Sequence, residues 1–75
     1  MVSLFTADIN ASGRTTSYHV VFNNDRYIFQ PTENATGTEF SVTREHDEWQ
    51  VQGNVDKDVQ SQAIAKLESY LLAQL

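Results

Sequence analysis

Apolar and polar residues change their spacing along this chain of 75 residues. Alternating positions rich in aromatic side chains fill residues 2–53, and apolar residues spaced by three and four follow in residues 54–75. Alternation is typical of a β-strand with one buried face, whereas spacing by three and four is typical of an amphipathic helix. The sequence therefore predicts an α+β fold, an antiparallel sheet with one C-terminal helix packed on one face.

Turn residues divide the alternating region into an N-terminal strand and two hairpins. We expect the first strand at residues 2–9, a polar connection around Gly13 at 10–17, and the second and third strands at 18–23 and 26–30. The Asn and Asp between the second and third strands tolerate the positive φ angles of a tight turn. These segments therefore form the first hairpin.

The second hairpin follows Pro31, which cannot donate a hydrogen bond to a strand ladder and so ends the third strand. After a polar loop at 32–37, we expect a fourth strand to begin near residue 38, to turn at residues 46–47, and to pair with a fifth strand that ends near Gly53. The result is a sheet of four to five strands in the order β-β-β-β-β-α. Residues 1–75 form a single domain of this kind.

The turn at residues 24–25 sets the register of the first hairpin. A two-residue turn, like a four-residue loop, places Val21 opposite Ile28 on one face. The other face carries the larger apolar side chains, which we assign to the core: Tyr18, Val20, Phe22, Tyr27 and Phe29. The hairpin is therefore apolar on both faces.

The helix is expected to begin near Asn54, a good N-cap residue, with Asp56 and Asp58 at the positive end of the helix dipole. Leu72 lies outside the apolar stripe and should be partly exposed. The stripe itself consists of Val59, Ala63, Ile64, Leu67, Tyr70, Leu71 and Leu75. Because one helix covers only one face of a sheet, the second face must meet solvent or a partner.

Charge and composition exclude several classes of partner. The net charge of −5 repels nucleic acid and anionic membrane surfaces, and the aromatic residues that could stack on bases are needed for the core. No apolar run approaches the roughly 20 residues of a membrane span, and no secretory signal precedes the first strand. We therefore expect no nucleic-acid or membrane partner, and a cytoplasmic location rather than a secreted one.

The segment from Asp8 to Gly13 matches the first half of a calcium-binding loop. It places oxygen-bearing side chains at Asp8, Asn10 and Ser12 before the glycine, but His19 occupies the position of the final glutamate. A strand connection explains the same residues. A weak calcium or divalent-metal site is therefore an alternative function only.

Catalytic and cofactor sites are not expected from this sequence. Three acids and a histidine gather in residues 45–48, but neighbouring residues at a hairpin tip point in divergent directions. The chain also has no cysteine, no nucleophile-elbow motif and no glycine-rich phosphate loop. We expect neither enzymatic activity nor a cofactor, and no small-molecule ligand.

A protein-interaction module is the function that this pattern favours. We expect an interface, with another protein or with a second copy, on the open sheet face around Val21 and Ile28, joined by Leu4 and His19, or along a free strand edge. A third alternative depends on charge alone, with the chain inhibiting a basic partner through its acidic side chains. Those side chains are Glu45, Asp47, Glu48, Asp56 and Asp58.

Overall fold

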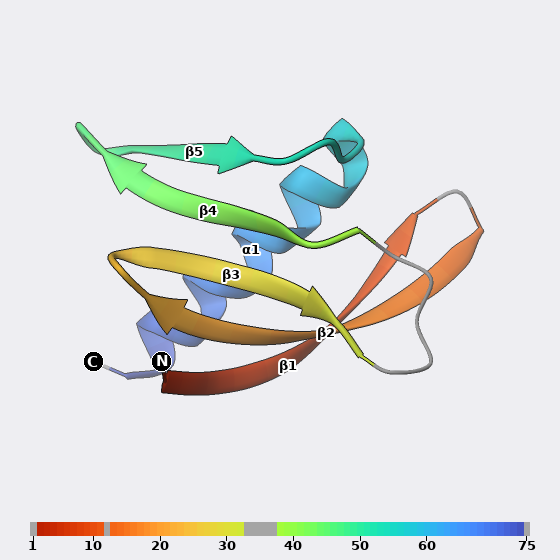
Figure 1. Ribbon diagram of the computed structural model, residues 1–75, viewed down its shortest axis with the longest axis horizontal. Coiled ribbons are helices and arrows are strands. Elements are labelled where there is room, and N and C mark those ends of the chain that lie inside the picture. The colour runs from red at the N-terminus through yellow and green to blue at the C-terminus, as the bar shows by residue number, and fades with distance from the viewer. Residues whose placement is uncertain (1, 12, 33–37, 75) are drawn as a thin grey trace.

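The computed structural model describes residues 2–11, 13–32 and 38–74, which form five strands followed by one helix (Figure 1). This confirms the predicted α+β fold. The elements are β1 (Val2–Ala11), β2 (Arg14–Asn23), β3 (Arg26–Pro31), β4 (Phe40–Glu45), β5 (Glu48–Gln52) and α1 (Lys57–Ala73).

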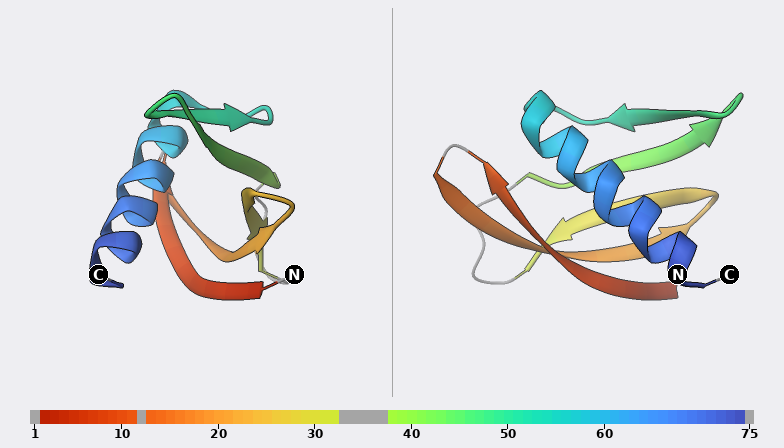
Figure 2. Two further views of the ribbon diagram at one scale, coloured as in Figure 1. Left: turned by 90° about the vertical axis from the view of Figure 1, so that its left-hand side faces the viewer. Right: turned by 180° about the vertical axis from the view of Figure 1, so that it is seen from behind.

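The five strands form one antiparallel sheet in which each strand lies beside its neighbour in sequence, in the order β1-β2-β3-β4-β5. The sheet curves, and α1 runs diagonally across the face inside this curve (Figure 2). We call this the inner face and the opposite side the outer face. Strands β1 and β5 form the two edges, and the start of β1 and the end of α1 lie at the end of the sheet that carries the β2–β3 and β4–β5 turns (Figure 1).

Both predicted hairpin turns are confirmed. The φ angles are positive at Asn24 (51°) and Asp25 (62°), and again at His46 (50°) and Asp47 (65°), as a two-residue type I′ turn requires. The turn lengths fix the expected pairing of Val21 with Ile28 and of Arg44 with Trp49. Local turn chemistry therefore determines the register of both hairpins.

The prediction of a polar connection at residues 10–17 is wrong. Strand β1 continues to Ala11 and β2 begins at Arg14, so only two residues separate them. Side chains on the outer face pair across the two strands, with Ser17 Oγ donating to Asp8 Oδ1 (2.6 Å) and Thr15 Oγ1 donating to Asn10 Oδ1. These polar pairs lengthen the hairpin, because hydroxyl and carboxylate groups satisfy one another across strands.

Two other predicted boundaries shift. The helix begins at Lys57 with Asp56 as the N-cap residue, instead of near Asn54, and the Gln60 amide makes the first helical hydrogen bond to the Asp56 carbonyl (3.0 Å). Val55 packs against the core ahead of the helix, which delays the first turn. Strand β4 begins at Phe40, two residues later than expected.

The core lies between α1 and the inner face of the sheet. Phe29 and Phe40 stack with ring centroids 4.8 Å apart, and Ala63 and Leu67 of the helix pack against the same cluster. Burial raises the pKa of Tyr18, so this phenol stays protonated at neutral pH. The buried residues of the core are Ala7, Ile9, Tyr18, Val20, Phe29, Phe40, Val42, Ala63 and Leu67.

The two leucines on α1 provide a test of this packing. Leu67 is fully buried, whereas Leu72 is 69% exposed, as its place outside the predicted stripe indicated. We expect Leu67→Ala to lower the free energy of unfolding by about 2–5 kcal/mol, because it leaves a cavity, and Leu72→Ala to change it by less than about 0.5 kcal/mol. Urea denaturation of the two variants measures both values, and equal losses would contradict the assigned core.

Candidate functional site

The outer face carries the residues that the sequence assigned to an interface. The core side chains Tyr18, Val20 and Phe29 contact the cluster under α1, so Val21 and Ile28 lie on the outer face as predicted. This face has no helix over it within the described residues (Figure 2).

Val21 nevertheless offers a partner little apolar surface. It is only 6% exposed, with Ser3 of β1 and Ile28 of β3 as its cross-strand neighbours. His19 is exposed, and its Nδ1 lies 3.5 Å from Thr6 Oγ1. The strand positions that share this face are mostly polar: Thr6, Asp8, Ser17, His19, Gln30, Ser41, Thr43 and Gln50.

Leu4 does not join Val21 and Ile28. The β1–β2 register shifts between Ser3 and Phe5, so Leu4 occupies an irregularity in the strand. It lines a cleft together with Tyr70 and Leu71 of the helix. The four residues of the predicted interface therefore do not form one surface.

The residues of the calcium-loop fragment lie in an extended strand. Asp8 and Asn10 belong to β1, and their side-chain oxygens accept the hydrogen bonds from Ser17 and Thr15. Ser12 lies outside the described residues. In the described part of the chain, no three His, Cys, Asp or Glu side chains converge as metal ligands would. An extended backbone does not wrap around an ion as a calcium loop does.

The acidic residues of the inhibitor hypothesis fall into two groups. Glu45, Asp47 and Glu48 surround the β4–β5 turn, whereas Asp56 and Asp58 lie at the start of α1. Strand β5 separates the two groups, and they occupy opposite ends of the sheet (Figure 1). They therefore do not form a single anionic surface.

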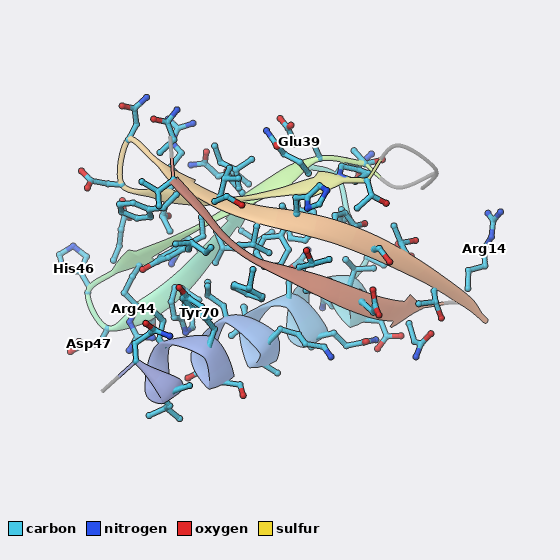
Figure 3. All side chains as sticks on the ribbon, turned by 90° about the horizontal axis from the view of Figure 1, so that it is seen from below. Arg14, Glu39, Arg44, His46, Asp47 and Tyr70 are labelled. Carbon is cyan, nitrogen blue, oxygen red and sulfur yellow. The ribbon has the colours of Figure 1, made fainter. Side chains whose placement is uncertain are left out.

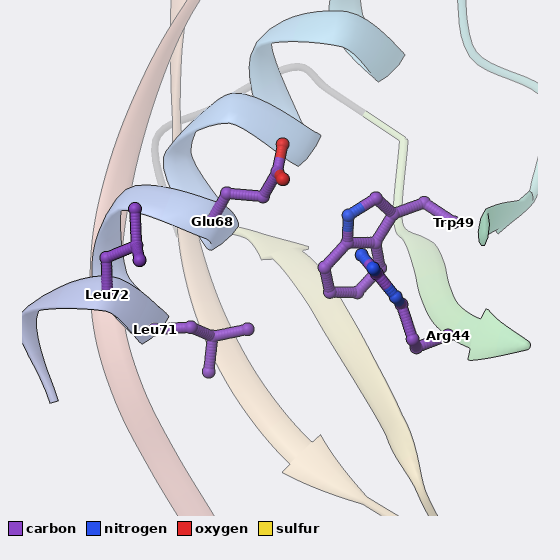
Figure 4. A pocket seen from close by; sticks show the side chains of 5 residues that line it. All are labelled: Arg44, Trp49, Glu68, Leu71 and Leu72. Carbon is purple, nitrogen blue, oxygen red and sulfur yellow. The ribbon is translucent and has the colours of Figure 1, made fainter. Parts of the chain in front are cut away.

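An apolar groove occupies the end of the inner face that α1 leaves uncovered. It consists of two adjoining clefts of about 260 and 220 Å³ that share Leu71. We call it the Leu71 groove. The first cleft is lined by Arg44, Trp49, Glu68, Leu71 and Leu72 (Figure 4), and the second by Val2, Leu4, Phe22, Tyr27, Tyr70 and Leu71.

Aromatic contacts join the two clefts into one surface. The Tyr27 ring lies 4.9 Å from Phe22 and 6.1 Å from Trp49 between ring centroids, so the three rings form a row across the sheet. On the helix side, Tyr70 stacks on Phe5 with centroids 4.6 Å apart. All five rings are half-buried and fixed by these contacts. Rigid aromatic side chains of this kind dominate the binding energy of many protein interfaces.

Trp49 lines the Leu71 groove beneath the side chain of Arg44. The guanidinium carbon of Arg44 lies 4.7 Å from the centroid of its ring, so the predicted cation–π contact is present. The indole Nε1 is buried and has no acceptor among the described residues. Glu68 extends from α1 toward the same ring (Figure 4).

Acidic side chains lie near one end of the Leu71 groove. Glu68 lines its first cleft together with Arg44, and the exposed Asp47 lies on the neighbouring β4–β5 turn. Glu45 and Glu48 pair on the outer face of that hairpin, away from the groove. Figure 3 shows that this turn, Arg44 and Tyr70 lie at the same end of the molecule, with Arg14 at the far end. The groove thus combines an apolar floor with one acidic and one basic side chain in its lining, Glu68 and Arg44.

The sequence predicted some features of the residues in the Leu71 groove, but it did not predict that these residues lie together. It predicted the Arg44–Trp49 pair and the exposure of Leu72. Leu71 lies beside Trp49 and Tyr27 because α1 runs diagonally across the sheet. The spacing of apolar residues in the sequence does not predict this path. One sequence signal could have located the groove. It is an apolar residue outside the helical stripe, here Leu72, in a chain whose hairpins end in aromatic residues.

Comparisons with protein-family models, with curated proteins and with solved structures find no match to this chain. Within the described residues, no helix has the length and apolar character needed to cross a bilayer.

Substitutions on β2 test the different environments of the outer face. We expect Val21→Asp to lower the free energy of unfolding by about 3 kcal/mol, because it buries an unpaired charge, and His19→Asp to lower it by less than about 1 kcal/mol. Thermal and urea denaturation of both variants check this difference. If Val21→Asp were as stable as His19→Asp, Val21 would be available to a partner after all.

Proposed function

We propose that this protein is a non-enzymatic interaction module whose Leu71 groove binds a basic, amphipathic segment of a partner protein. The observation that carries the proposal is the pair of adjoining apolar clefts that make up the groove, with Leu72 and Val2 exposed at their margins. Leu72 is 69% and Val2 is 58% exposed. Contiguous apolar surface of this kind marks interaction sites in water-soluble proteins.

The dimensions of the groove favour a protein segment over a small molecule. Each cleft is smaller than the roughly 300–1,000 Å³ of typical ligand pockets. Two small clefts separated by Leu71 instead suit two apolar side chains one helical turn apart, as in complexes where an amphipathic helix lies in a groove.

The net charge of the chain specifies the chemistry of the partner. Glu68 and Arg44 are the charged residues among those described that line the two clefts, and they offset one another. The net charge of −5 then favours lysine or arginine residues beside the apolar anchors of the segment. A second copy of this chain, with its own net charge of −5, is poorly matched to the groove.

The lining of the groove supports binding rather than catalysis. Its polar side chains are Arg44, Glu68 and the phenols of Tyr27 and Tyr70, and among the described residues no serine, threonine, cysteine or histidine lines the two clefts. General acid–base or nucleophilic chemistry usually needs such a group with an orienting partner.

Tryptophan fluorescence tests the proposal, because Trp49 is the only tryptophan of the chain. The probe is a synthetic amphipathic peptide of leucine and lysine, with leucines at helical spacing. We expect saturable binding and a blue shift of the Trp49 emission as the indole leaves water. The matched control is the same peptide with glutamate in place of lysine, which should bind much more weakly because the chain carries a net charge of −5.

Two variants of equal charge locate the binding site. Leu72→Gln should weaken binding of the lysine peptide by about 10-fold or more, since a leucine loses its apolar contact, while Ala65→Gln at an exposed position off the groove should not. Both substitutions are at exposed positions and leave stability nearly unchanged. Equal binding of both peptides, or by both variants, would refute the proposed site.

A further inference from the structure

The edge of β1 carries backbone groups that no neighbouring strand uses. In an antiparallel pair, residues alternate between pairs that exchange two hydrogen bonds and pairs that exchange none. The two-residue turn makes Ala11 and Arg14 a hydrogen-bonded pair, so the peptide groups of Asn10, Asp8 and Thr6 point away from β2. Because β1 is an outer strand, these groups face the open side of the sheet.

Gln62 of α1 closes one end of this edge. Its Oε1 accepts from the Asn10 backbone N–H (3.0 Å), and its Nε2 donates to the Asn10 carbonyl oxygen. The side-chain amide thus takes the place of a paired strand at Asn10. At the other end, the irregularity at Leu4 interrupts the pattern. Thr6 and Asp8 are left between these limits, with two outward donors and two outward acceptors.

An open groove runs beside Thr6 and Asp8. It has a volume of about 400 Å³ and lies between the strand edge and the second half of α1. Ser69 and Ala73, both exposed and small, line its helix side together with Lys66 and Tyr70. This groove shares Tyr70 with the Leu71 groove, and its other lining residues are different.

We propose that a second copy of this chain pairs with β1 in an antiparallel, two-fold symmetric arrangement centred on Ala7. In this register Thr6 of one copy lies opposite Asp8 of the other, and each pair exchanges two backbone hydrogen bonds. The four outward groups of each copy are then all satisfied, and the two sheets join into one.

Three features of the edge match a second copy in particular. On the outer face, a threonine hydroxyl meets a carboxylate in both symmetry-related pairs, so no like charges lie opposite one another. On the inner face, Ala7 meets Ala7, where larger side chains would clash. The two-fold axis also brings the two helices side by side, where the small Ser69 and Ala73 leave room beside Lys66 and Tyr70.

Amide hydrogen exchange gives a direct test with the unmodified chain. At micromolar concentration the amides of Thr6 and Asp8 should exchange rapidly, whereas those of Ala7 and Ile9, bonded to β2, and of Asn10, bonded to Gln62, should be protected. At millimolar concentration Thr6 and Asp8 should gain protection while the molar mass doubles in light scattering. Added salt should strengthen the dimer, because it screens the repulsion between two chains of net charge −5.

A chain made by chemical synthesis with one N-methylated peptide group tests whether the β1 edge forms the dimer. N-methylation of Asp8 removes an outward donor and leaves the β1–β2 ladder intact, and should weaken the dimer by about 30-fold or more, since the two copies together lose two hydrogen bonds. The matched control is N-methylation of Val51, whose amide points outward from β5 by the same alternation. This control should dimerise as the unmodified chain does.

The outcomes distinguish dimerisation through β1 from peptide binding in the Leu71 groove. Leu72→Gln should leave the dimer unchanged, even though it weakens peptide binding. A chain that stays monomeric at millimolar concentration would overturn the proposal, as would a dimer that survives N-methylation of Asp8. A dimer that Leu72→Gln dissociates would place the second copy in the Leu71 groove and would overturn pairing through β1.

Discussion

A single helix must cover the inner face of a five-stranded sheet, and the rest of the structure depends on this limit. Strands about 4.8 Å apart make a sheet nearly 20 Å wide, whereas a helix with its side chains is about 10–12 Å across. The diagonal path of α1 covers part of the wider sheet, and its Ala63 and Leu67 are buried in the core cluster. The uncovered remainder is the aromatic end at Phe22, Tyr27 and Trp49, so the Leu71 groove is a direct result of this shortage.

Local rules explain the parts of the fold that the sequence predicts well. Turns of two residues at Asn24–Asp25 and His46–Asp47 fix both registers, and the three-and-four spacing of residues 59–71 defines the buried side of α1. The errors arise where distant groups decide the outcome. The polar segment 10–17 becomes strand because side chains pair across it, and the helix starts late because Val55 is held by the core.

The candidate site was harder to predict for the same reason. Alternation places Val21 on the outer face, but it cannot show that neighbouring strands of a curved sheet reduce its exposure to 6%. Nor does it indicate that the irregularity at Leu4 turns this residue toward Tyr70 and Leu71. The direction of a side chain follows from local periodicity, whereas its accessibility depends on the path of the whole chain.

The hydrogen bonds of Gln62 to Asn10 affect more than the placement of the helix. An edge strand with a long run of free peptide groups is a template for unlimited growth into fibrils. Here a side-chain amide ends the run at Asn10 and a bulge ends it at Leu4, which leaves a template only two outward residues long. Such a short template resists cross-β polymerisation, so one glutamine on a helix protects an otherwise vulnerable ten-residue strand from aggregation.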